Sequence, residues 1–117
     1  NEMIKFLVIK AMETIEECAD FPNIQATQLN CERAHLTVQH PGQDIEWHQD
    51  GGEITAVYTA ATPGGGEFVF DTPGGTRRID FAKNQLYVFD GSQRHRAEAP
   101  VAKRPRVLLV MKFGTIS

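Results

Sequence analysis

Two hydrophobic patterns divide the chain and predict one helix followed by short strands. From Met3 to about Ala19, apolar residues recur at helical spacing, with Lys and Glu at other positions. This periodicity predicts an amphipathic helix over residues 3–19, and Pro22 limits it. Farther along, the pattern changes to short runs rich in Val, Ile, Thr, Phe and Tyr, with Gly and Pro between them. We therefore expect β-structure after the helix.

The short runs predict eight strands. They lie at about 33–39, 45–49, 53–60, 67–71, 76–81, 86–90, 94–99 and 105–113. Many short strands with regular turn signals after one helix are typical of a β-sandwich or a double-sheet jelly roll. We expect a mainly β fold with a jelly-roll core over about 33–113. The glycine-rich segments 63–66 and 71–76 are expected either as mobile loops at the mouth of this core or as plain hairpin turns.

Length and charge narrow the class of protein. A chain of 117 residues is long enough for one core and too short for two, which predicts a single domain over 1–117. The net charge of -3 shows no basic excess, so nucleic acid is not expected as a partner. No apolar run approaches the length of a membrane span, so no membrane association is expected. A peptide, a protein or a small molecule is the expected partner.

The two cysteines, Cys18 and Cys31, bear on the compartment. They lack the paired spacing of a zinc site and are too few for a disulfide framework. The start of the chain also lacks the pattern of a signal peptide. These features favour a reduced, cytoplasmic setting.

The sequence Trp47-His48-Gln49-Asp50 contains the first candidate for chemistry. Alternate residues of a strand share a face, so His48 and Asp50 are expected to project in the same direction. An imidazole and a carboxylate are two of the three ligands in the 2-His-1-carboxylate arrangement that holds non-haem Fe(II). The alternative is a loop with two unrelated polar residues.

A metal site of this kind needs a second histidine. His95 follows an apolar run over 86–89 and a turn, and a jelly roll can fold this late strand back beside the first one. His35 and His40 flank an earlier strand, and each is expected to be an ordinary surface or core residue. The expected ligand set is therefore His48, Asp50 and His95.

A basic residue opens the longest apolar strand near the C-terminus. Arg106 shares a face with Leu108 and Val110, and a guanidinium group there can bind a carboxylate through two parallel hydrogen bonds. Arg104 has the same parity, so alternation does not separate the two. Pro105 and the position at the start of the strand favour Arg106, and the alternative is that both arginines are solvated.

The order His48, Asp50, His95, Arg106 resembles that of the Fe(II)- and 2-oxoglutarate-dependent dioxygenases, specifically the prolyl-4-hydroxylase-like branch. The resemblance covers about residues 30–113. It extends to three further stretches, which are "VQHPGQDIEWHQD", "PGGGEFVFDTPGG" and "LYVFDGSQRHRAEAPV". The chain departs from the family in a shorter N-terminal part, in the turn over 82–85 and in a slightly longer interval from His95 to Arg106, which keeps Arg104 as the fallback.

The resemblance implies a mechanism and its cofactors. Fe(II) would be held by the two histidines and the aspartate, with 2-oxoglutarate and O2 as cosubstrates and ascorbate as an optional reductant. Arg106, helped by the hydroxyl of Tyr58, would bind the distal carboxylate of 2-oxoglutarate. The face of Tyr58 carries Ile54, Ala56 and Ala60, as a barrel interior requires, although a core tyrosine with its hydroxyl at the surface fits this pattern equally well.

The expected reaction is hydroxylation of a substrate C–H bond, with oxidative decarboxylation of 2-oxoglutarate to succinate and CO2. The family-level expectation for the substrate is a peptidyl proline or a related residue, with a free small molecule as the other option. A different class of function, a non-catalytic cupin-like module that binds a metal or ligand, also fits the strand pattern.

Overall fold

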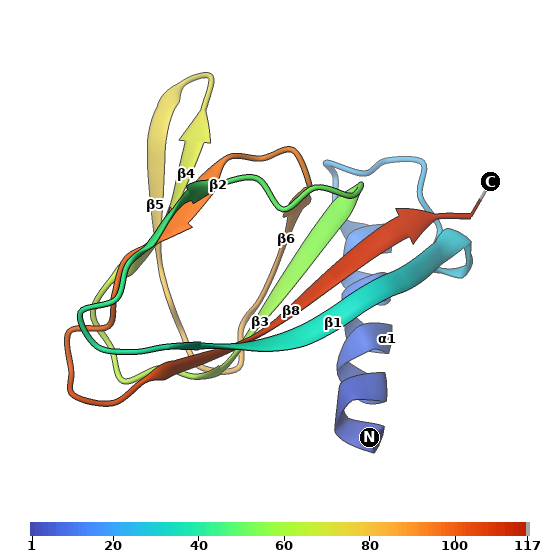
Figure 1. Ribbon diagram of the computed structural model, residues 1–117. Helices are drawn as coiled ribbons and strands as arrows, with labels where there is room; N and C mark the ends of the chain where they lie inside the picture. The colour runs from blue at the N-terminus through green and yellow to red at the C-terminus, as the bar shows by residue number, and fades with distance from the viewer. Residues whose placement is uncertain (117) are drawn as a thin grey trace.

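The computed structural model describes residues 1–116 as two four-stranded antiparallel sheets and an N-terminal helix (Figure 1). Sheet I has the strand order β1-β8-β3-β6 and sheet II the order β2-β7-β4-β5. The elements are α1 (Glu2–Glu17), η1 (Ala26–Gln28), β1 (Leu29–Gln39), β2 (Ile45–His48), β3 (Ile54–Ala61), β4 (Glu67–Thr72), β5 (Gly75–Asp80), β6 (Leu86–Asp90), β7 (His95–Ala97) and β8 (Arg106–Thr115). The chain passes repeatedly from one sheet to the other, which confirms the jelly-roll prediction.

Helix α1 begins at a side-chain cap and packs on the outer face of sheet I. The Asn1 side chain accepts a hydrogen bond from the backbone N–H of Met3 at 2.8 Å, which satisfies one of the free donors at the start of the helix. Ala11 and Ile15 are fully buried. They contact a cluster that includes Ile54, Ala56, Leu109, Met111 and Phe113. The predicted helix is confirmed, and it ends at Glu17, slightly earlier than expected.

The inner face of sheet I packs against sheet II through a second cluster. Its buried members are Val57, Phe68, Phe70, Phe81, Ala97 and Leu108. Figure 1 shows α1 on one side of sheet I and strands β4 and β5 on the other. Sheet I is therefore covered on both faces, so apolar residues on β3 and β8 do not by themselves reveal which face is the interior.

The largest difference from the predicted strands is at the start of β1. It begins at Leu29 rather than near residue 33, because its first residues pair with the end of β8, as in Leu29 with Thr115 and Cys31 with Phe113. A register shift between Cys31 and Arg33 joins this segment to the rest of the strand. The extension depends on a partner strand and has no periodic signal of its own. Among the described residues, no helix combines the length and apolar character that crossing a membrane requires.

Candidate metal centre

The three residues predicted as metal ligands come together between the sheets. His48 is the last residue of β2 and His95 the first of β7, and these two positions pair directly across the antiparallel strands. Asp50 follows in the loop after β2. The sequence pattern predicted that strand alternation would bring Asp50 to His48, whereas in the structure the loop does so. The site is therefore built by one strand pairing and one short loop.

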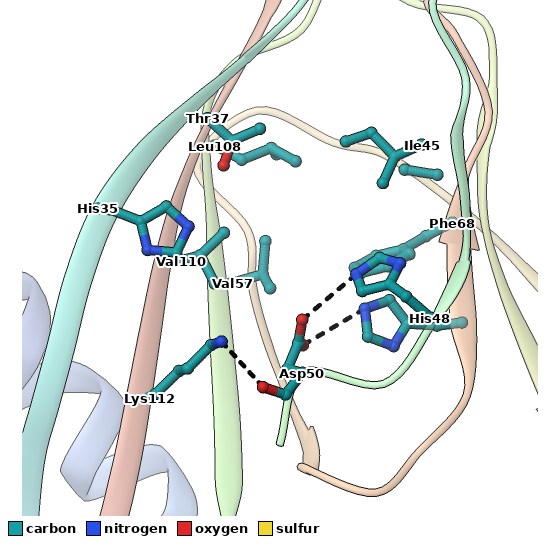
Figure 2. A pocket seen from close by; sticks show the side chains of 12 residues that line it. His35, Thr37, Ile45, His48, Asp50, Val57, Phe68, Leu108, Val110 and Lys112 are labelled. Atoms are coloured by element: carbon teal, nitrogen blue, oxygen red, sulfur yellow. Dashed lines mark hydrogen bonds and ion pairs between the residues drawn. The ribbon is translucent and has the colours of Figure 1, made fainter. Parts of the chain in front are cut away.

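The carboxylate of Asp50 faces two adjacent imidazoles, with one oxygen directed at each ring (Figure 2). Its Oδ1 is 3.3 Å from His48 Nε2 and its Oδ2 is 3.4 Å from His95 Nε2. One ligand atom from each of the three residues lies within 4.8 Å of the others. The side chains of His95 and Asp50 are 4% and 11% exposed, whereas that of His48 is 39% exposed. The group is open to solvent mainly on the His48 side.

Backbone carbonyls orient both imidazoles for metal binding. His48 Nδ1 is 2.7 Å from the carbonyl oxygen of Glu46, and His95 Nδ1 is 2.8 Å from that of Gln93. A carbonyl oxygen only accepts hydrogen bonds, so Nδ1 carries the proton in each ring and the lone pair of Nε2 points toward Asp50.

The protonation state of the group also fits a metal. Burial lowers the pKa of His95, which keeps its ring neutral at pH 7. Asp50 Oδ2 is buried without a hydrogen-bond partner. The Nε2 atoms of His48 and His95 and a buried carboxylate oxygen without a hydrogen-bond partner form a donor set that fits a divalent cation such as Fe(II).

A cavity of about 170 Å³ adjoins the three side chains. Most of its lining is apolar and comes from both sheets, namely Ile45, Val57, Phe68, Ala97, Leu108 and Val110. Three further polar residues, His35, Thr37 and Lys112, line it from sheet I, and Lys112 Nζ donates to the backbone carbonyl of Asp50 at 2.9 Å. The cavity has the size of a small organic molecule.

Arg106 is fully buried between the sheets, whereas Arg104 is exposed. Its guanidinium group stacks 3.9 Å from the centre of the Phe81 ring and donates to neutral acceptors. These are Gln39 Oε1, the carbonyl oxygens of Glu98 and Gly65, and Thr62 Oγ1. Burial lowers the pKa of Arg106. Of the two arginines left open by the sequence, only Arg106 lies inside, although it is not among the residues that line the cavity.

No protein-family model matches the sequence, and no curated protein matches it. Solved structures do match. An oxidoreductase of the 2OG-Fe(II) oxygenase family from Burkholderia pseudomallei aligns with a TM-score of 0.67 and 22% identity over 74% of this chain and 45% of its own. A prolyl-4-hydroxylase from Pseudomonas putida aligns with a TM-score of 0.57 and 20% identity over 72% of this chain and 52% of its own.

A cupin domain from Bordetella pertussis also aligns, with a TM-score of 0.51 and 18% identity over 74% of this chain and 86% of its own. The chain spans about half the length of the two oxygenases and most of the length of the cupin. What these proteins share with this chain is the fold. At these identities the likeness does not extend to an activity.

Tyr58, predicted to help bind 2-oxoglutarate, is not among the residues that line the cavity. Its side chain lies on the outer face of sheet I, beside Leu7 of α1, and its hydroxyl donates to Asn84 Oδ1 at 2.8 Å. On β3 the inward residues are those with odd numbers, such as Val57, which lines the cavity. The face of Tyr58 is apolar because α1 covers it. Tyr58 therefore has no route to a ligand in the cavity.

The sequence interpretation also missed three polar residues of the cavity wall, one of which is Thr37 on β1. His35 was expected to be an ordinary residue, and Lys112 was not considered. Lys112 has the same parity on β8 as Leu108 and Val110, so strand alternation places all three on one face. This shared parity could therefore have identified Lys112 as a cavity residue from the sequence. His40, in contrast, is exposed, as expected.

Proposed function

We propose that this protein is an Fe(II)- and 2-oxoglutarate-dependent dioxygenase that hydroxylates a C–H bond. The observation that carries the proposal is the group of His48, Asp50 and His95, with both Nε2 atoms facing one buried carboxylate. The likeness in fold to a 2OG-Fe(II) oxygenase and to a prolyl-4-hydroxylase supports it. So does the order of the same residues along the sequence.

The three side chains would hold Fe(II) on one face and leave the opposite positions open. The carbonyls of Glu46 and Gln93 keep each Nδ1 protonated, which fixes the rings in the orientation that presents Nε2. When bound, iron and 2-oxoglutarate supply the oxidation: 2-oxoglutarate loses CO2, one atom of O2 enters the succinate, and the other enters the substrate as hydroxyl. The apolar side chains around the cavity exclude water from the reacting atoms.

Arg106 is proposed to bind the distal carboxylate of 2-oxoglutarate. It is a buried cation, and no carboxylate pairs with it among residues 1–116. The guanidinium group of Arg106 would form stronger hydrogen bonds with a carboxylate than with its present neutral acceptors, because hydrogen bonds between charged groups are stronger than those to neutral groups. The side chains of Gln39 and Thr62 would have to yield their bonds to Arg106 for this to occur.

The substrate prediction is a peptidyl proline or a related residue, drawn from the sequence resemblance, and nothing in the structure tests it. A free small molecule is the other option. Ascorbate as a reductant and a cytoplasmic location likewise stay predictions. The low basic content still argues against nucleic acid.

A second candidate is a cupin-like module that binds a metal or ligand without turnover. It is favoured by the hydrogen bonds of Arg106, which occupy four of the five N–H donors that a guanidinium group offers. The chain also spans most of the cupin domain that it resembles in fold. The two functions differ in whether the protein consumes 2-oxoglutarate.

The test is anaerobic addition of Fe(II) and then 2-oxoglutarate, with visible absorption spectroscopy to detect the charge-transfer band of a chelated keto acid. O2 is then admitted and succinate is measured. We expect a band followed by succinate, even without a primary substrate. Folded protein that binds Fe(II) but gives neither band nor succinate would favour the cupin-like module.

His48→Ala is the informative variant at the metal, because its exposed side chain can be removed without opening the core. We expect it to abolish the charge-transfer band while the melting temperature of the metal-free protein stays near that of the wild type.

Arg106→Lys is expected to weaken 2-oxoglutarate binding by about tenfold or more, since an ammonium group cannot form the two parallel hydrogen bonds of a guanidinium group. Arg104→Lys is the matched control, and the reverse result would move the role to Arg104.

A further inference from the structure

The wall of sheet I that faces the metal centre carries the hydroxyl of Thr37 and two nitrogen-containing side chains, none of which the proposed mechanism uses. Lys112 on β8 and His35 on β1 both line the cavity, and Figure 2 shows them across it from His48. Their neighbours on this wall are mostly apolar, as in Leu108 and Val110. A cation and an imidazole on such a wall call for a specific explanation, because burying polar groups without partners is unfavourable.

Both side chains have unused hydrogen-bonding capacity. Lys112 Nζ donates to the backbone carbonyl of Asp50, and within residues 1–116 no carboxylate forms an ion pair with it. An ammonium group has three N–H donors, so donors remain. His35 Nδ1 is buried and has no hydrogen-bond partner. A buried ring nitrogen without a partner is uncommon in folded proteins, and a bound ligand is one way to satisfy it.

The charges around the cavity favour an anion. Asp50 is the one carboxylate among the described residues that line it, and a divalent metal bound there would outweigh its charge. Lys112 then adds a further positive charge. Burial, followed by the charges of Arg33 and Lys112, lowers the pKa of His35, so its ring is neutral and offers one N–H. One cation and one neutral donor match a single carboxylate.

We propose that Lys112 and His35 bind a carboxylate of the molecule that is oxidised, and that this substrate is a short aliphatic acid. The proposal rests on the proposed function and takes the second of its two substrate options, a free small molecule. Lys112 lies at the metal end of the cavity, since it contacts the backbone of Asp50. Arg106, the residue proposed for the distal carboxylate of 2-oxoglutarate, is not among the residues that line the cavity, whereas Lys112 and His35 are. The apolar lining suits the aliphatic part of the substrate.

The test compares isobutyrate with isobutyramide, which have nearly the same shape and differ in charge. Each is titrated by calorimetry into protein loaded with Zn(II), which performs no oxidation, with and without saturating 2-oxoglutarate. We expect isobutyrate to bind at least about tenfold more tightly than the amide in both series. Equal binding, or no binding of isobutyrate at tens of millimolar, would overturn the proposal.

Three variants locate the preference. Lys112→Met keeps the aliphatic stem of the side chain and is expected to abolish the preference for isobutyrate. Lys112→Arg is expected to retain this preference, and His35→Leu is expected to reduce it severalfold. Lys103→Met is the control, since it removes the same charge at an exposed position. A preference that survives Lys112→Met, or that is lost in Lys103→Met, would contradict the assignment.

Two further measurements separate the alternatives. A tenfold weaker affinity of Lys112→Met for 2-oxoglutarate would mean that the pair serves the keto acid and not the substrate. A lower affinity for Zn(II) would mean that Lys112 holds the loop of Asp50 in place and has no role toward a ligand. Either result would overturn the proposal. The dioxygenase proposal has its own failing result, which is wild-type protein that gives neither a charge-transfer band nor succinate. In that case the Zn(II) titrations without 2-oxoglutarate still test whether Lys112 and His35 bind a carboxylate.

Discussion

A single glycine determines how closely two backbone segments approach behind the metal centre. Gly91 follows β6 and lies against the loop that carries Asp50: Gly51 donates its N–H to the Gly91 carbonyl at 3.2 Å, and Gly91 donates to the carbonyl of Glu53 at 2.9 Å. A Cβ atom at Gly91 would lie 2.5 Å from the carbonyl oxygens of both Gly51 and Gly52. The absence of a side chain here is what lets the loop reach its position.

We expect Gly91→Ala to push this loop away and to weaken metal binding by about tenfold. The same overlap should lower the free energy of unfolding by about 1–3 kcal/mol. Gly74→Ala is the control, because nothing lies within 4 Å of a Cβ atom at that position. Calorimetric titration with Zn(II) measures the metal affinity, and urea unfolding measures the stability. If Gly91→Ala and Gly74→Ala had the same affinity and stability, Gly91 would not lie tightly against the loop that carries Asp50.

At the scale of elements, one carboxylate connects three strands of sheet II. Glu98 Oε2 accepts hydrogen bonds from Arg78 of β5 and Arg96 of β7, both at 3.0 Å, and its Oε1 accepts one from the backbone N–H of Glu67 in β4 at 3.1 Å. The hydrogen bond from Arg78 is the largest cause that lowers the pKa of Glu98 below its usual 4.5. The network ties the outer strand β5 to the strand that begins with His95.

We expect the stabilisation from Glu98 to depend on pH. Because the pKa is lower in the folded state than in the unfolded state, the contribution is complete above the unfolded value near 4.5. It is lost as the pH falls through the lower folded value. Glu98→Gln should therefore be less stable than the wild type by about 0.5–1 kcal/mol at pH 7.

That difference should shrink on acidification below the unfolded pKa. Urea unfolding of both proteins between neutral pH and pH values below 4.5 measures it. Glu46→Gln, at an exposed position on β2, serves as the control for removing one negative charge. A difference that is independent of pH would mean that the carboxylate acts through packing rather than through charge.

At the scale of the whole molecule, sheet I is a wall with different neighbours on its two faces. Its inner face lines the cavity, and its outer face is covered by α1 through residues that include Ala11 and Ile15. The helix thus supports the wall from behind without contacting the candidate site.

Ile15→Ala is expected to cost about 2–5 kcal/mol of unfolding free energy, since Ile15 is fully buried. Ile9→Ala removes the same atoms from a position on the same helix that is 54% exposed, and should change the stability by less than about 0.5 kcal/mol. Urea unfolding compares them. Metal affinity of the folded Ile15→Ala protein should match the wild type, and a large loss would show that the helix controls the site.

The sequence by itself determined the features that depend on neighbours along the chain. The 3.6-residue period located the helix, and short runs rich in Val, Ile, Thr, Phe and Tyr between Gly and Pro located all eight strands, because both signals are local to one element. His48 and Asp50 were paired by strand alternation, and the structure brings them together through the loop after β2 instead. Arg106 was favoured over Arg104 by its position at the start of a strand.

Only the tertiary structure decided which face of each strand is the interior. Both faces of β3 are buried because α1 covers one and sheet II the other, so the pattern could not show that Tyr58 points away from the cavity. Pairing of β2 with β7 brings His95 to His48. The packing of β1 and β8 places His35 and Lys112 on the opposite wall. These contacts join residues distant in sequence, and periodicity within one element carries no information about its partner.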